Sequence, residues 1–237
     1  MHVGVSADLV VILLKGKKIP FTTTMKKLLT LILVCITLSS WAQKAEDLFN
    51  KDVRVTWLGV DYSHVKLIGD FAQFFHFGER SSWHIKHKYF PAWNDLVLNE
   101  REKYDVRGML RRDEIFYEIG MIDEVNRNTS LDEIESYNNP HYTPEDISKF
   151  VSAYDTTGSS GIGVVFIAES LNKADNEAYF HFVAFNLSTK EILIQQRLRS
   201  EPGGFGIRNY WAGALHEAMK KVERNYYWNW REEFAKK

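Results

Sequence analysis

The chain has 237 residues, of which 45% are hydrophobic and 14% aromatic, and its formal net charge is −1. This length and apolar content are enough for one domain with a sizeable core. The nearly balanced charge excludes the strongly basic surface expected of proteins that bind nucleic acid or anionic membranes by electrostatic attraction.

Residues 25–42 have the pattern of a secretory signal peptide. Two lysines precede the short apolar run Leu28–Leu38, and small residues stand at the third-last and last positions of the segment. The run is about half of the ~20 residues that an anchored membrane helix needs, so no stable transmembrane anchor is expected. We therefore expect export with cleavage after Ala42, and we interpret residues 1–24 as upstream translation.

The single cysteine, Cys35, lies inside that apolar run, so residues 43–237 contain none. Disulfides and cysteine-bound metals are thereby excluded from the mature chain. The preceding Val34 does not fit a lipid-attachment site. Cleavage would leave a single domain, residues 43–237, with 25 basic and 30 acidic residues. An exported chain without disulfides fits a bacterial periplasmic or secreted protein.

The first strand is predicted at Val53–Val60, where apolar and polar residues alternate. The sequence DYSH follows it as a turn, ahead of an apolar run from Val65 to Phe75 that favours a turn or helix. Asp61, Ser63 and His64 in this turn are candidate ligand-binding residues. They also suggest a hydrolase, although no G-x-S-x-G motif surrounds the serine.

Two histidines, His84 and His87, have a spacing that places both rings on one face of a helical turn. They make half of a metal site, which His76 and His141 could complete in space. With no cysteine in the mature chain and no H-E-x-x-H motif, a structural or surface role is favoured, and we predict no metal and no cofactor.

The middle of the chain predicts a helix from Pro91 to Tyr104, ending before Gly108, and a second strand over Glu114–Ile122. The polar stretch Asp123–Tyr142 then predicts a long surface excursion. Thr143, followed by proline and two acids, has the pattern of a helix N-cap.

Three strands are predicted next, at Ile162–Ser170, Ala178–Leu187 and Glu191–Ser200. Their short connections require antiparallel neighbours. The preceding stretch Asp155–Gly163 (DTTGSSGIG) looks like a phosphate loop, but it enters a strand and lacks the lysine and helix of such loops. We interpret it as a linker.

The stretch Glu201–Gly213 (EPGGFGIRNYWAG) is predicted to be a strand-to-helix corner, since Pro202 ends the strand and the amphipathic helix Ile207–Arg224 follows. An exposed helix start beside Arg208 and Asn209 could hold an anion or a carboxylate. The alternative is a structural corner, clamped by its aromatic residues Phe205 and Trp211 and made by Gly203, Gly204, Phe205, Gly206, Tyr210 and Trp211.

The aromatic tail Tyr226–Phe234 either folds back on the domain or offers a partner an apolar patch. Together these elements predict an α+β fold. It has a mixed sheet of about five strands, a C-terminal antiparallel three-strand meander, and helices packed mainly on one face.

The segments VTWLGVDYSHVKLIGDF, YFPAWNDLVLNEREKY and GGFGIRNYWAGALHEAMK, after a signal sequence, resemble a family of uncharacterised exported proteins of Bacteroidetes-type bacteria. This resemblance implies no reaction and no catalytic residue. A fainter likeness, of topology only, is to the lipoprotein activators of penicillin-binding proteins and the amino-terminal domain of TolB. The chain departs from those activators in lacking their lipid-attachment cysteine.

Two hypotheses for the function follow. The first is an exported, non-enzymatic cell-envelope binding or accessory protein with a possible envelope protein partner. The second is a hydrolase or small-ligand-binding enzyme that uses Asp61, Ser63 and His64, facing Arg208 and Asn209 across one cleft. The enzyme requires these side chains to converge, with a base in hydrogen-bond reach of the serine or of a water. The accessory protein requires only that they are separately satisfied.

Overall fold

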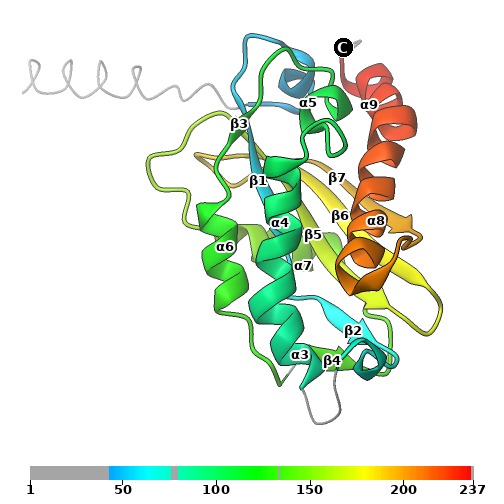
Figure 1. The fold of residues 1–237 in the computed structure, drawn as a ribbon. Helices are drawn as coiled ribbons and strands as arrows, with labels where there is room; N and C mark the ends of the chain where they lie inside the picture. The colour runs from blue at the N-terminus through cyan, green and yellow to red at the C-terminus, as the bar shows by residue number, and fades with distance from the viewer. Residues whose placement is uncertain (1–42, 76–79, 133, 236–237) are drawn as a thin grey trace, which may run out of the picture. The chain divides into compact units, whose positions relative to one another are not determined.

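A sheet of seven strands is the centre of the part of the chain that the structure describes (Figure 1). The structure is a computed structural model, and it describes residues 43–75, 80–132 and 134–235. The expected upstream and signal segments, residues 1–24 and 25–42, lie outside the described residues, as does His76. The described residues form one compact unit.

The longest strand of the sheet, β5, has neighbours on both sides. On one side β1 pairs with its first half and β2 with its last residues, both in parallel, and β3 and β4 extend this side by parallel pairing with β1 and β2. On the other side β6 pairs antiparallel with β5, and β7 antiparallel with β6. The strands are β1 (Val55–Asp61), β2 (Lys66–Ile68), β3 (Phe116–Tyr117), β4 (Glu135–Ser136), β5 (Ile162–Asn172), β6 (Glu177–Asn186) and β7 (Ile192–Ser200).

A mixed sheet with helices is thus confirmed, but it has seven strands where about five were predicted. The two additional strands are β2 and β4, since the other five overlap the predicted strands. Each has only two or three residues. Such short strands show no alternation that a sequence pattern could reveal.

Helices cover both faces of the sheet. Helices α4 and α8 pack on one face around Trp57, Phe166 and Trp211, and α7 packs on the other around Leu58 and Val165 (Figure 1). The α-helices are α3 (Ser81–His84), α4 (Phe90–Asn99), α5 (Val106–Met109), α6 (Gly120–Arg127), α7 (Pro144–Ser152), α8 (Gly206–Lys221) and α9 (Tyr227–Phe234). There are two 3₁₀ helices, η1 (Ala45–Phe49) and η2 (Ala72–Phe74), and two π-helical segments, η3 (Ile85–Tyr89) between α3 and α4 and η4 (Val222–Tyr226) between α8 and α9, among the described residues. The larger core lies under α4 and α8, so the expected one-sided packing is met only in part.

None of the described helices is long and apolar enough to cross a membrane.

Two predicted elements are met only in part. The run Val65–Phe75, expected to form a turn or helix, begins with the strand β2 and contains only the 3₁₀ turn η2, because β2 finds strand partners in β4 and β5. The predicted strand Glu114–Ile122 shortens to β3, and α6 begins at Gly120. Isoleucines in so short a run fit a strand and a helix equally well, and the fold decides between them.

The structure also moves one predicted helix end and confirms one predicted helix start. The helix expected to reach Tyr104 ends at Asn99, and Gly108 lies inside the separate helix α5, where its backbone N–H donates to Asp105 at 2.8 Å. The predicted N-cap at Thr143 is confirmed. Its hydroxyl accepts from the Asp146 backbone N–H at 3.2 Å, and the Asp146 carboxylate accepts from the Thr143 N–H at 3.0 Å.

The strand-to-helix corner is where the sequence puts it, but Phe205 does not clamp it. Its side chain is 96% exposed, whereas Trp211 is 2% exposed and stacks on Phe71 at 5.6 Å between ring centroids. The corner is held instead by close backbone packing. A Cβ added to Gly213 would lie 2.2 Å from the Gly203 carbonyl oxygen, so only glycine permits this approach.

The aromatic tail folds back on the domain. Tyr227 and Trp230 are 4% and 5% exposed, and Trp230 stacks on Phe182 of β6 at 4.7 Å. Only Trp228, at 46%, is left substantially exposed among these three. The tail therefore belongs to the core, and the hypothesis of a broad aromatic patch for a partner loses its main residues.

Candidate ligand-binding cleft at the carboxyl end of β1

The carboxyl end of β1 is a point where chain connections leave toward opposite faces of the sheet. The connection from β1 to its parallel neighbour β3 runs through α4 on one face. The connection from β3 to β5, the parallel neighbour on the other side, runs through α7 on the opposite face. In open α/β sheets, ligands bind in the crevice that such a reversal opens beyond the carboxyl ends of the strands.

Two buried asparagines hold this end of β1 in place. Asn94 of α4 accepts from the Val60 N–H at 2.7 Å and donates to the Val60 carbonyl at 3.1 Å. Asn126 of α6 donates to the same carbonyl at 2.9 Å and accepts from the Tyr62 N–H at 2.6 Å. Their amides therefore replace a neighbouring strand beyond the short β3, and they fix the backbone that carries the DYSH turn.

Asp61 is the buried first residue of this turn. One carboxylate oxygen accepts from the Tyr154 hydroxyl of the α7 end at 2.6 Å, and the other from the Ser63 backbone N–H at 2.7 Å. Burial, followed by the nearby Asp61 carboxylate, raises the pKa of Tyr154 well above its ordinary value, so its hydroxyl keeps the proton that it donates. Asp61 thus serves as a turn cap that ties β1 to α7.

The remaining turn residues line a cleft of about 570 Å³. Its walls come from the DYSH turn and the start of β2, from the end of α6 with the segment after it, and from α7 and the loop before it. The residues that matter most for its chemistry are Ser63, His64, Lys66, Thr129, Tyr142 and Phe150. The volume lies within the range of small-molecule sites.

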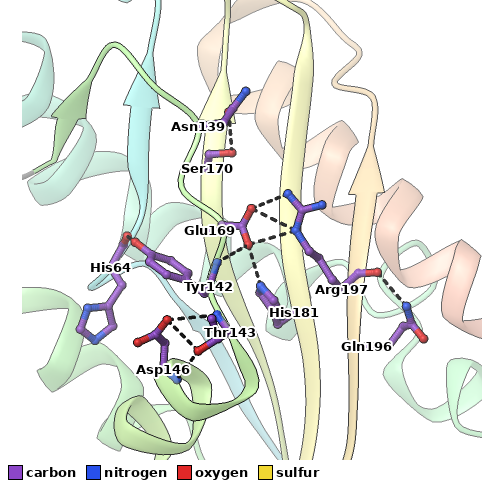
Figure 2. A network of polar contacts seen from close by, with 10 residues as sticks. All are labelled: His64, Asn139, Tyr142, Thr143, Asp146, Glu169, Ser170, His181, Gln196 and Arg197. Atoms are coloured by element: carbon purple, nitrogen blue, oxygen red, sulfur yellow. Dashed lines mark hydrogen bonds and ion pairs between the residues drawn. The ribbon is translucent and has the colours of Figure 1, made fainter.

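One wall of the cleft is aromatic. The His64 ring stacks on Phe150 of α7 with 3.5 Å between ring centroids, and the Tyr142 ring meets Phe150 edge-on at 5.1 Å. The Tyr142 hydroxyl also donates to the His64 backbone carbonyl, as Figure 2 shows. The imidazole is therefore held by stacking as part of a rigid surface.

Two residues that line the cleft, Ser63 and Thr129, have hydroxyls that are buried without a partner among the described residues, as are the hydroxyls of Thr56, Ser82 and Ser200 elsewhere in the fold. The side-chain oxygens of Ser63 and Thr129 are inaccessible to solvent and make no hydrogen bond within the described residues. Thr129 as a whole is 7% exposed. Sequence reasoning selected Ser63 but missed Thr129, which lies in what was expected to be a surface excursion. No pattern in the sequence indicates that this excursion passes the end of β1.

A buried ionic network supports the cleft wall from behind (Figure 2). The Glu169 carboxylate of β5 accepts from His181 of β6 at 2.8 Å, from Arg197 of β7 at 2.6 and 3.1 Å, and from the Tyr142 backbone N–H at 3.3 Å. Burial alone would raise the pKa of Glu169. The hydrogen bonds from His181 and Arg197 outweigh it and hold that pKa below its ordinary value. This network, also missed from sequence, anchors the loop that carries Tyr142.

The structure does not bring Arg208 and Asn209 to this cleft. Both are exposed at the start of α8. The Arg208 backbone carbonyl accepts from the Trp93 indole at 2.9 Å, and its guanidinium lies 3.8 Å from Glu100. Trp93 belongs to the core under α4 and α8, whereas the partner of Asp61, Tyr154, belongs to the core on the other face. The pairing of the DYSH turn with the start of α8 is therefore not seen.

His84 and His87 take part in aromatic contacts. His84 stacks on Phe75 at 5.3 Å, and His87 lies 4.7 Å from the Trp83 ring. Within residues 43–75, 80–132 and 134–235, no group of three or more His, Cys, Asp or Glu side chains is arranged to hold a metal ion.

The chain was also compared with known proteins. No model of a protein family and no curated protein matches it.

Proposed function

We propose that the chain is an exported, non-enzymatic binding protein of the bacterial cell envelope, and that its ligand site is the cleft at the carboxyl end of β1. The observation that carries this proposal is the cleft itself, which lies beyond the carboxyl end of β1 and combines apolar side chains such as Val65, Ile134 and Phe150 with polar residues of the DYSH turn. Small-molecule sites have this combination of a mainly apolar wall and a few polar groups.

Binding is favoured over hydrolysis by the way the DYSH residues are used. Both Asp61 oxygens accept hydrogen bonds, from Tyr154 and from the Ser63 backbone. The Ser63 hydroxyl makes no hydrogen bond to His64 or to any other described residue. A serine nucleophile needs a base in hydrogen-bond reach and an acid that orients this base. Here the three residues hold a turn and line a wall.

The envelope location is supported by the signal pattern of residues 25–42 and by the absence of cysteine after Cys35. The resemblance to exported proteins of Bacteroidetes-type bacteria agrees with this location. An accessory role is consistent with the fainter topological likeness to activators of envelope enzymes, although likeness of fold alone does not transfer function.

The export part of the proposal is tested by the mass of the protein purified from the envelope of its native host. We expect a chain that begins at Gln43. A product that retains Met25, or one that carries a lipid on Cys35, would contradict export with simple cleavage.

The binding part is tested by nuclear magnetic resonance of this mature protein, titrated with a small-molecule extract of the same envelope. We expect amide shifts to concentrate at Ser63, Thr129 and Phe150, with none at the exposed Trp228. Saturable shifts elsewhere would move the site. Consumption of an extract component by the wild type but not by Ser63→Ala would replace binding by hydrolysis.

A further inference from the structure

The charges around the cleft disfavour a charged ligand. No aspartate or glutamate is found among the described residues that line it, so a cation would meet no counter-charge there. The two lining side chains that can carry positive charge, Lys66 and His64, already have interaction partners. Lys86, which approaches from behind, is bound to the Thr129 backbone carbonyl at 2.6 Å. An anion would therefore find no free cation in the described lining.

One wall of the cleft is the C-terminal end of helix α6. The helix ends at Arg127, and Val125, Asn128 and Ser130, from its last turn and the segment after it, line the cleft. The last backbone carbonyls of a helix have no partner within the helix and carry a partial negative charge. Such an end favours a ligand that donates hydrogen bonds, and it disfavours an anion.

The polar side chains that a ligand can reach on this wall are neutral. Asn128 and Ser130 are exposed, in contrast to the buried hydroxyls of Ser63 and Thr129. An amide and a hydroxyl each offer both a donor and an acceptor. Alcohol groups have the same double capacity, so a ligand with several hydroxyls can bond this wall in either direction.

Another wall of the cleft is aromatic. Phe150, which stacks with His64 and meets Tyr142 edge-on, is only half-buried, as is Tyr142, so part of each ring borders the cleft. The face of an aromatic ring is electronegative. The C–H groups of a sugar ring are weakly positive and pack against such a face, while the sugar hydroxyls stand at the rim.

The aromatic wall is also ordered before a ligand arrives. The Tyr142 backbone N–H donates to Glu169 at 3.3 Å, and its hydroxyl donates to the His64 backbone carbonyl (Figure 2). A wall that is already fixed loses little conformational freedom when a ligand binds. A ligand without hydroxyls would fit this cleft less well, because it would displace water from Asn128 and Ser130 without replacing the lost hydrogen bonds.

We propose that the cleft binds a neutral saccharide. One face of a sugar ring lies against Phe150 and Tyr142, and its hydroxyls exchange hydrogen bonds with Asn128, Ser130 and the carbonyl end of α6. This inference rests on the proposed function, which puts ligand binding in the same cleft, and adds the chemical class of the ligand.

The test compares probes that differ in charge or in hydroxyl content. The full mature protein is titrated with three neutral sugars (glucose, galactose and N-acetylglucosamine), with glucuronate and protonated glucosamine as charged counterparts, and with cyclohexanol as a ring with a single hydroxyl. Amide shifts locate the binding and give the affinity. We expect at least one neutral sugar to shift Asn128 and Phe150. It should bind about fivefold more tightly than the charged sugars and cyclohexanol, the value of one hydrogen bond between neutral groups.

Two variants assign the contacts. Asn128→Ala should weaken binding of the preferred sugar about fivefold, through the loss of one hydrogen bond. Its matched control is Asn99→Ala, since Asn99 is also exposed at a helix end but lies outside the cleft. Phe150→Leu keeps an apolar side chain, removes the ring, and should weaken binding by a similar factor. Its control is Phe74→Leu, which changes a half-buried ring packed against the other core.

The outcomes separate the two proposals. If cyclohexanol binds in the cleft as tightly as the sugars, or a charged sugar binds more tightly, the neutral saccharide is wrong and the cleft remains a ligand site. If Phe150→Leu disturbs the fold, Asn128→Ala still decides, because it removes only an exposed side chain. Unchanged sugar affinity in Asn128→Ala would overturn the proposed contacts.

Two further results concern the cleft itself. Shifts outside the cleft for every probe would overturn both proposals. If no probe binds at tens of millimolar while the envelope extract still shifts Asn128 and Phe150, the saccharide is wrong and the proposed function stands.

Discussion

The carboxyl end of β1 and the corner between β7 and α8 look alike in sequence, yet the structure uses them differently. Each follows a strand and combines polar residues with glycine or aromatic neighbours. At the corner Trp211 enters the core, and the backbone at Gly213 closes on Gly203. At the end of β1 two asparagines fix the backbone, but the turn beyond it borders a cleft with unbonded hydroxyls.

Residue type alone therefore does not separate a structural corner from a ligand site. Arg208 and Asn209 are as suitable for an anion as Ser63, but Arg208 at the corner is already beside Glu100 at 3.8 Å. What distinguishes the cleft is the open hollow beyond the strand end. Buried polar atoms without a partner occur in both regions, since the Ser200 hydroxyl and the Trp211 indole nitrogen beside the corner are in the same state as the Ser63 and Thr129 hydroxyls. Stability measurements can separate the two cases, because structural groups cost stability when removed and unsatisfied groups do not.

The largest effect is expected at the corner, from Trp211→Ala. Removing this buried indole should lower the free energy of unfolding by about 3–5 kcal/mol, through lost burial and a residual cavity. The exposed Phe205 is the control, and Phe205→Ala should change stability by less than about 0.5 kcal/mol. Chemical denaturation measures both. Equal losses would mean that Phe205 does clamp the corner.

The next effect is a backbone clash. Gly213→Ala puts a methyl group where the Gly203 carbonyl lies, so the corner must open, at about 1–3 kcal/mol. The control is Gly120→Ala at the start of α6, where an added Cβ meets no atom within 4 Å. This control should be neutral or slightly stabilising. Stabilisation by Gly213→Ala would show that the corner is loosely packed and could admit a ligand.

Local sequence signals predict much of the fold where they are strong. The capping box at Thr143, the long strands after Gly161 and the helix after Gly206 have clear periodicity or caps, and the structure has them. The short β2 and β4 depend on parallel pairing with each other and, for β2, with β5 far along the chain. Parallel pairing of two or three residues leaves no local pattern, so these strands can only be found in three dimensions.

The candidate site was predictable in part for the same reason. The DYSH turn was selected because polar residues directly follow a strand. Thr129, by contrast, reaches the cleft because α6 returns along β1, and Glu169 meets Arg197 only through the pairing of three strands. Glutamate and histidine inside apolar strands were the one available signal for that network. The sequence does not reveal which partners they find.

At the end of β1, Asn126→Ala is expected to cost about 1–3 kcal/mol, because the Tyr62 N–H loses its buried partner and the Val60 carbonyl keeps only Asn94. Binding in the cleft should weaken as well, since the turn is no longer fixed. The exposed Asn99 at the end of α4 is the control. If Asn126→Ala costs no more than Asn99→Ala, the asparagines do not define the geometry of the cleft.

Acid should loosen the wall that Tyr142 forms. The pKa of Glu169 is below its ordinary value of 4.5 in the folded chain, because donors from His181 and Arg197 outweigh the effect of burial. Its contribution to stability is therefore fully present above about pH 4.5 and is lost as the pH falls through the lower, folded pKa.

Arg197→Met should raise that pKa by removing one donor, so the acid unfolding midpoint should move to higher pH. The control Arg199→Met breaks ion pairs with Glu177 and Glu201, whose side chains are 20% and 67% exposed. Solvent screens these pairs, so the shift should be smaller. Acid titration followed by circular dichroism compares the two. Identical midpoints for both variants would mean that the Glu169 network contributes no more to acid stability than the more exposed pairs of Arg199.

The smallest effect on the unfolding free energy is expected at Thr129 beside the cleft. This small effect separates the cleft from the corner, where substitutions are costly. Thr129→Val keeps the shape of the side chain and removes a buried hydroxyl that no described residue satisfies. Unfolding free energy should stay the same or rise slightly, because an unsatisfied polar group is lost. Thr143→Val is the matched control, since it removes the N-cap of α7 and should cost about 1 kcal/mol. If Thr129→Val costs as much as this control, its hydroxyl has a structural partner in solution and belongs to the fold. If it costs nothing, the hydroxyl takes no part in holding the wall of the cleft, and packing and the asparagines alone fix that wall.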